Sequence, residues 1–251
     1  HHLLQGWFEL DFENNLGAAE SRFMEAIVVA RKSYDTSLLV SAKAGLACAA
    51  HFKGRFADAR AGFEEVAVEL AARTGMFRWG RFGGPTEAMW MAAECSLLQG
   101  DPDGLRRMCE EFNRLRSDRP PAFPALADIV HALDALRQGD VDSAEAALRK
   151  AVDMGESEYA KDAAPFMNYA HVAHMYYAGV LRVLGDNSGA DRHLARAREI
   201  VERSRLRSVT SFLVEWEKEL TRAFRVLIEP KREGFAGRDS VLFQAAAGAV
   251  G

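Results

Sequence analysis

The chain has 251 residues, of which 49% are hydrophobic and 27% are charged, and its formal net charge is −4. This is enough apolar material for one large or two ordinary domains, and the near balance of charge provides no basic field that would concentrate nucleic acid. No run approaches the roughly 18 apolar residues of a membrane span, and no basic segment leads into an apolar one at the N-terminus. We therefore expect a soluble globular protein that is neither inserted in a membrane nor marked for secretion.

One phrase recurs five times along the chain: a turn residue, an acidic or small residue, and then A-x3-[F/L]-x2-A. The turn residues lie 40, 46, 39 and 46 positions apart, at Asn14, Gly54, Gly100, Gly139 and Gly185. Each copy follows about fourteen residues with apolar positions at helical spacing, and each glycine stands where a left-handed helix C-cap is wanted. The repeating unit is therefore predicted to be helix, tight turn, helix.

These units should pack closely and stack. Ala59, Ala144 and Ala190 are small where two helices must approach, and the residue four positions later is large enough to fill the gap between helices. Because one pair cannot bury both of its faces, the pattern predicts an all-α solenoid of five antiparallel pairs. The predicted pairs cover about 1–33, 36–73, 86–117, 122–155 and 163–204.

An amphipathic helix is expected after the fifth pair, over 209–228. Phe212, Trp216, Leu220 and Phe224 follow one another at i, i+4 steps, with charged residues opposite, and Pro230 stops the helix. We predict that this helix caps the open end of the stack, which makes 1–228 one repeat domain and 229–251 a C-terminal tail.

The chain resembles the tetratricopeptide (TPR) repeat, because all five copies match the spacing of its A-x3-F-x2-A second half. The small residue of the first half recurs as Ala47, Ala93, Ala132 and Ala178, but the first copy has Trp7 there. No copy has the closing proline, and the units exceed the usual 34 residues. The segment "RFGGPTEAMWMAAECSLLQGD" is similar to a junction in the TPR regions of bacterial LuxR-type regulators and cyclase-linked signalling ATPases. That resemblance implies a sensor or scaffold part without its effector domains.

In such repeats the first helix of each pair lines the concave surface, so the resemblance implies a groove whose side chains are mostly apolar. The predicted partner-binding residues are Phe8, Phe12, His51, Phe52, Trp90, Glu94, Ile129, Leu133, Arg137, Met175 and Arg182. Such a groove would be a larger apolar patch than monomers normally tolerate if it stood open. Four interpretations remain: tight packing on neighbouring helices or a repeat register that is off by one, a partner helix or peptide, the chain's own apolar tail or a second subunit, and an apolar small ligand.

The stretch "RTGMFRWGRFGGP" interrupts the helical pattern between the second and third pairs. Arg78, Trp79 and Arg81 offer guanidinium and indole groups that can clamp an acidic peptide or stack on bases. The alternative is a structural joint in which glycines allow the turn, Pro85 starts the next helix and Glu87 suits the positive end of its dipole. The acidic balance of the chain makes nucleic acid an unlikely partner for this loop.

No catalytic signature is present. His171 and His174 lie at i, i+3 on one helical face and could share a metal with His131, but no H-E-x-x-H motif occurs, and these histidines equally suit hydrogen bonds to neighbouring tyrosines. No G-x-S-x-G elbow exists, and the three cysteines lie within helical patterns as small hydrophobes, which also suggests a reducing, cytoplasmic setting. No cofactor is expected.

The sequence therefore predicts a non-catalytic interaction or sensor module of a cytoplasmic bacterial regulatory protein, whose groove binds a partner helix or peptide. Two other functions stay open. One is a receptor domain for a small molecule or peptide inducer. The other is an enzyme with a groove-borne site around His131, His171 and His174.

Overall fold

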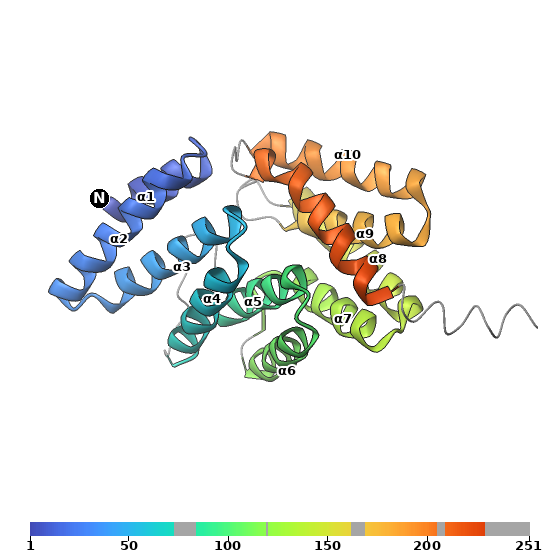
Figure 1. The fold of residues 1–251 in the computed structure, drawn as a ribbon, viewed down its shortest axis with the longest axis horizontal. Helices are drawn as coiled ribbons and strands as arrows, with labels where there is room; N and C mark the ends of the chain where they lie inside the picture. Colours follow the sequence, from blue (N-terminus) through green and yellow to red (C-terminus); the bar gives the residue numbers. More distant parts are fainter. Residues whose placement is uncertain (73–83, 119, 162–168, 205–208, 229–251) are drawn as a thin grey trace, which may run out of the picture.

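The computed structural model describes residues 1–72, 84–118, 120–161, 169–204 and 209–228, and these residues form 11 helices and no strand (Figure 1). Ten helices carry labels in Figure 1, and the eleventh, at 209–228, is drawn in red. The labelled helices are α1 (His2–Asp11), α2 (Leu16–Ser33), α3 (Thr36–Phe52), α4 (Phe56–Ala71), α5 (Pro85–Gln99), α6 (Pro102–Asp118), α7 (Ala125–Gln138), α8 (Val141–Lys161), α9 (Ala170–Leu184) and α10 (Asn187–Ser204).

The helices follow one another in adjacent pairs, as the repeat predicts. Each helix packs on its neighbours in sequence, and the first helices of successive pairs also touch, α1 on α3, α5 on α7 and α7 on α9. The helices of the five pairs span 2–33, 36–71, 85–118, 125–161 and 170–204. This packing is consistent with a helical repeat.

The turns within the pairs confirm the role assigned to their glycines. Gly54, Gly100, Gly139 and Gly185 have φ of 73°, 69°, 86° and 92°, and Asn14 takes φ 54° at the same place in the first pair. This left-handed conformation costs glycine nothing and asparagine little. After three of the glycines an aspartate caps the next helix: the carboxylate of Asp101, for example, accepts the backbone N–H of Gly104 at 2.8 Å.

Small residues bring the helices close together. Ala59, Ala144 and Ala190 are fully buried, as predicted. Gly6 of α1 and Gly45 of α3 both face the ring of Phe23, and a Cβ on Gly6 would lie only 2.7 Å from that ring. The first two pairs therefore meet around one aromatic side chain that leaves no room for a methyl group.

Helix 209–228 reaches much further than the predicted cap on the last pair. The ring of its Phe212 lies 5.4 Å from that of His51 and 5.2 Å from that of Phe52, both on α3. Arg222 donates to the carbonyl oxygen of Leu98 on α5 at 3.1 Å, and Phe224 packs against Gly179 of α9. The helix thus contacts first helices of the second, third and fifth pairs, and burial against them removes its apolar side from water.

No helix in the described part of the chain is long and apolar enough to cross a membrane. The tail at 229–251 and the stretch at 73–83 lie outside the described residues, so the predictions made for them are not addressed by the fold.

The close crossing of α9 and α10 gives a test of the repeat register. Ala190→Arg places a long charged side chain at a fully buried position of α10 and should lower the free energy of unfolding by about 3 kcal/mol or more. Ala195→Arg, at an exposed position of the same helix, should change it by less than about 0.5 kcal/mol. Urea unfolding followed by circular dichroism measures both, and equal stability of the two variants would show that the register is wrong.

Candidate functional site

Most of the predicted groove residues lie in the interior of the molecule. Each of the following is no more than 3% exposed: His51, Trp90, Glu94, Ile129, Leu133 and Met175. These six side chains therefore do not line an open groove. The first helices of the pairs pack on one another there, and helix 209–228 lies against α3, α5 and α9, so side chains of this chain fill the space. This matches the alternative of tight packing on neighbouring helices.

The other five predicted groove residues lie nearer the surface. Phe52 is half-buried against Phe212, Arg137 pairs with Asp134 at 2.8 Å, and Arg182 pairs with Glu217 of helix 209–228 at 3.0 Å. On α1 the side chain of Phe8 is 53% exposed, and the ring of Phe12 lies 5.7 Å from it. Only the α1 end of the predicted surface thus keeps a large apolar side chain mostly in solvent.

A sealed polar centre ties three of the helix pairs together. The carboxyl group of Glu94 on α5 lies 2.7 Å from Nε2 of His51 on α3, and it accepts the hydroxyl proton of Tyr176 on α9. Glu94 and Tyr176 have no exposed surface. Burial, and then the charge of Glu94, raise the pKa of Tyr176 well above its usual range. This centre can hold helices in register but offers no route to a ligand.

A second polar centre lies between α8, α9 and α10 and includes two residues that the sequence did not single out. His174 of α9 places Nε2 2.9 Å from Glu156 of α8 and Nδ1 2.8 Å from Nδ1 of His193 on α10. Arg196, one turn after His193, donates to both oxygens of Glu156, at 2.6 and 2.7 Å. The only sequence signal for His193 and Glu156 was that polar residues stand near the core positions of their helices.

The charges of this second centre fix which groups are ionised. The guanidinium of Arg196 lowers the pKa of Glu156 to about 2, against the opposing effect of burial. Burial lowers the pKa of His174, and burial together with the neighbouring His174 lowers that of His193 to about 4. At neutral pH the centre therefore consists of an ionised carboxylate and two neutral imidazoles.

Comparison with known proteins does not identify a family for this chain. No protein-family model, no curated protein and no solved structure matches this chain. The likeness to tetratricopeptide repeats thus rests on the residue pattern and on the pairing of the helices, and function has to be argued from the surface and the two polar centres.

The histidines proposed as metal ligands are not brought together. His131 is exposed on α7, whereas His174 is buried and bonded to His193 and Glu156. Within the described ranges, no group of three or more histidine, cysteine, aspartate or glutamate side chains could hold a metal ion. The tyrosine alternative fits only in part, because the ring of Tyr177 packs on His193 at 4.6 Å while its hydroxyl donates to Glu145 at 3.1 Å.

The remaining candidates offer little chemistry. Burial raises the pKa of Cys95 and raises that of Cys109 to about 12, so neither is a ready nucleophile. Arg78, Trp79 and Arg81 lie outside the described residues. Pro85 does begin α5, but the Glu87 side chain is fully buried and accepts the backbone N–H of Ala122 at 2.7 Å. Glu87 therefore fastens the α6–α7 connection as well as the start of its own helix.

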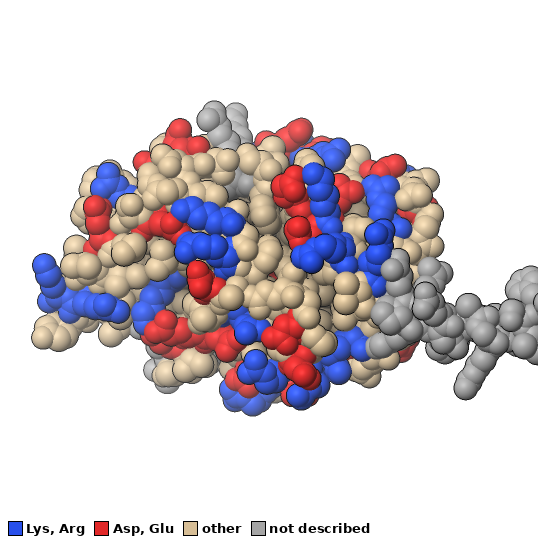
Figure 2. All heavy atoms as spheres, viewed as in Figure 1, with Lys and Arg blue, Asp and Glu red and all other residues tan. Residues whose placement is uncertain are grey.

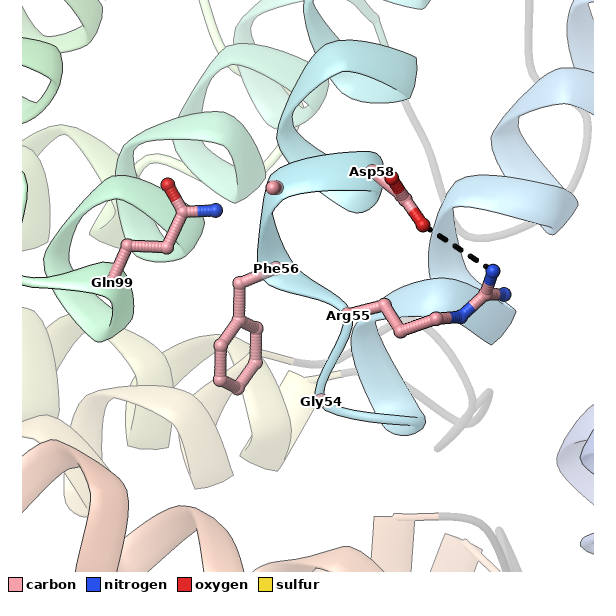
Figure 3. A pocket seen from close by; sticks show the side chains of 6 residues that line it. Gly54, Arg55, Phe56, Asp58 and Gln99 are labelled. Atoms are coloured by element: carbon pink, nitrogen blue, oxygen red, sulfur yellow. Dashed lines mark hydrogen bonds and ion pairs between the residues drawn. The ribbon is translucent and has the colours of Figure 1, made fainter.

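A shallow hollow opens where α4 begins beside the end of α5 (Figure 3). It is lined by Gly54, Arg55, Phe56, Ala57, Asp58 and Gln99. The ring of Phe56 points into it, and Arg55 pairs with Asp58 at 3.3 Å (Figure 3). Because the two charged groups of the hollow are paired with each other, it provides no strong anchor for a ligand.

The sealed centre predicts a large effect on stability. Glu94→Ala leaves the buried Tyr176 hydroxyl without its acceptor and the buried His51 Nε2 without its partner, which should lower the free energy of unfolding by about 3 kcal/mol. Glu110→Ala, which removes only the exposed partner of Arg106 on α6, should cost less than about 1 kcal/mol. Urea unfolding measures the stability of both variants. Similar losses of stability would show that Glu94 does not hold α3, α5 and α9 together.

The second centre predicts acid sensitivity. The pKa of His193 is lowered on folding, so the protein is stabilised above the ordinary histidine pKa and loses that stability as the pH falls from about 6.5 toward 4. The lowered pKa of Glu156 has the same effect: stability is lost as the pH falls from about 4.5 toward 2. Because His193 is partly exposed, the effect is smaller than the pKa shift alone implies. We expect the free energy of unfolding to fall by about 1–2 kcal/mol between pH 7 and pH 4.5.

The groups that set this sensitivity come from every element around the two histidines. They are Glu156, Tyr177, Asp186, Arg192 and Arg196. His193→Gln should reduce the loss measured by urea unfolding at the two pH values, and His131→Gln, at an exposed site, should leave it unchanged. If His193→Gln loses as much stability between the two pH values as the original protein, the second centre is not the source of the acid sensitivity.

Proposed function

We propose that this chain is a non-catalytic, tetratricopeptide-like interaction module that binds an amphipathic helix of a partner protein beside α1. The observation that carries the proposal is the placement of helix 209–228. Its aromatic residues lie along α3 and α9: Phe212 on His51, and Phe224 5.9 Å from the ring of Tyr176. An amphipathic helix is thus already accommodated by the first helices of the pairs, which is the helix-in-groove mode of recognition.

The exposed part of this surface begins at the first pair. Leu4, Phe8 and Phe12 stand at i, i+4 and i+8 of α1, and Leu4 and Phe8 are 66% and 53% exposed. On α2, Met24 and Val28 are 59% and 50% exposed. Large apolar side chains in solvent thus gather on α1 and α2, which favours contact with another molecule.

The α1 surface continues an interface that the chain already uses. Helix α1 contacts α3, and α3 carries Phe52 against Phe212 at the start of helix 209–228. Figure 2 shows uncharged surface, in tan, extending from the first pair toward that helix. A second helix beside α1 would therefore lie next to the surface that helix 209–228 already uses.

The charges of α1 specify the partner further. Glu9 lies in the last turn of α1 and Glu13 follows just after the helix, and α1 contains no lysine or arginine. Charge complementarity favours a partner helix that carries apolar residues at i, i+4 and i+8 and lysine or arginine beside them. From the resemblance to LuxR-type and cyclase-linked regulators we infer a cytoplasmic bacterial regulatory protein as the setting.

A selection experiment tests the proposal on the full chain. A display library of amphipathic helical peptides is selected against the protein, and the affinities of enriched peptides are measured by fluorescence polarisation. Phe8→Arg should weaken binding at least about tenfold, because it charges the centre of the apolar surface and repels the basic flank.

Val226→Arg is the matched control, since Val226 is 59% exposed on helix 209–228, away from α1. It should leave the affinity within about twofold of the original. The proposal fails if no amphipathic peptide is enriched, or if Phe8→Arg binds the enriched peptides as tightly as Val226→Arg does.

A further inference from the structure

The hydrogen bonds of the second polar centre determine where its protons lie. Arg196 donates to both oxygens of Glu156, and an ionised carboxylate can only accept hydrogen bonds. Nε2 of His174, 2.9 Å from Glu156, must therefore carry a proton and donate it. A neutral imidazole has one proton, so Nδ1 of His174 is left with a lone pair.

The same reasoning extends to the next ring. Nδ1 of His193 lies 2.8 Å from Nδ1 of His174, and since the latter is an acceptor, His193 must donate from Nδ1. Nε2 of His193 is then the atom with the lone pair. The chain of contacts from Arg196 through Glu156 and His174 thus selects one tautomer of His193.

The ring of His193 is only partly covered. Its side chain is partly exposed to solvent, and the contacts that hold it reach Nδ1 and one face of the ring. The ring of Tyr177 packs on it at 4.6 Å, and the hydroxyl of Tyr177 is held by Glu145. The imidazole is therefore fixed at one nitrogen and one face, while the nucleophilic nitrogen points away from the bonds that hold it.

We propose that His193 is a nucleophilic modification site that accepts an acyl group from an activated acyl compound at Nε2. The Nε2 lone pair attacks the carbonyl carbon, and the bond from that carbon to the leaving group breaks, with the electron pair going to the leaving group. The acylated ring would carry a positive charge, which is removed when its Nδ1 proton passes to Nδ1 of His174. The resulting imidazolium of His174 is stabilised by the carboxylate of Glu156.

This inference stands apart from the proposed helix-binding surface. It uses α8, α9 and α10, whereas that surface lies on α1 and α2. One transfer to His193 is a modification rather than turnover, so it does not require the chain to be an enzyme.

Acylation by diethyl pyrocarbonate tests the inference on the full chain. The rate at each histidine is followed by peptide mass spectrometry at pH 7.5 and at pH 5.5, with exposed His131 as the internal reference when variants are compared. The neutral fraction of an ordinary histidine falls about tenfold between these two pH values, whereas His193, with a pKa of about 4, stays almost entirely neutral. We expect the His193 rate to change by less than about twofold.

Variants distinguish proton transfer through His174 and Glu156 from simple exposure of His193. Glu156→Gln removes the charge that selects the tautomer and receives the proton, and it should slow His193 about tenfold while leaving His131 unchanged. Glu199→Gln is the matched control, because Glu199 also binds Arg196, at 2.6 Å, but does not touch the histidines. It should leave the His193 rate within about twofold.

Three results would overturn the proposal. One is a roughly tenfold fall in the His193 rate between pH 7.5 and pH 5.5, another is an equal effect of Glu199→Gln and Glu156→Gln, and the third is an unchanged His193 rate in Glu156→Gln. Should Glu156→Gln fail to fold, the pH profile of the wild-type protein decides. A half-maximal His193 rate near pH 4 supports the proposal, and one near pH 6.5 refutes it.

Discussion

A carboxyl group without access to water constrains the middle of this molecule. Glu94 can be buried only because His51 and Tyr176 bind its two oxygens, and those residues come from the second and fifth helix pairs. The pairs must therefore curve until α3, α5 and α9 meet around it. Helix 209–228 depends on the same curvature, since Phe212 packs on His51 and Trp216 lies 6.3 Å from the ring of Tyr176. The interior is thus specified by one polar contact as much as by apolar packing.

The local structure could be predicted from the sequence because its causes are local. Gly100 and Gly139 adopt the left-handed turns that their spacing suggested, and Ala144 and Ala190 are buried at the crossings between helices. The periodicity of apolar residues also identified the inner side of the first helices correctly as apolar. The periodicity could not show whether that side is open. An amphipathic helix such as 209–228 has the same sequence pattern whether it packs on the end of the stack or on its inner side.

The polar centres escaped prediction for a related reason. Glu156 and His193 are joined through His174 across three helices, and no spacing within a single helix signals such a contact. His131 and His171 were grouped with His174 because they are histidines near it in the repeat, yet in the structure His174 contacts Glu156 of α8 and His193 of α10. The type of residue was informative here, but its partner was decided by tertiary structure.

The long reach of helix 209–228 has a consequence for how the chain becomes ordered during synthesis. The helix pairs are built from contacts between neighbours in sequence and can form as they leave the ribosome. The bond from Arg222 to Leu98, by contrast, spans 124 residues. Until helix 209–228 has been synthesised, the inner faces of α3, α5 and α9 lack the side chains that shield them in the folded molecule. Helix 209–228 can complete the burial of those faces only after the repeats that precede it have been translated.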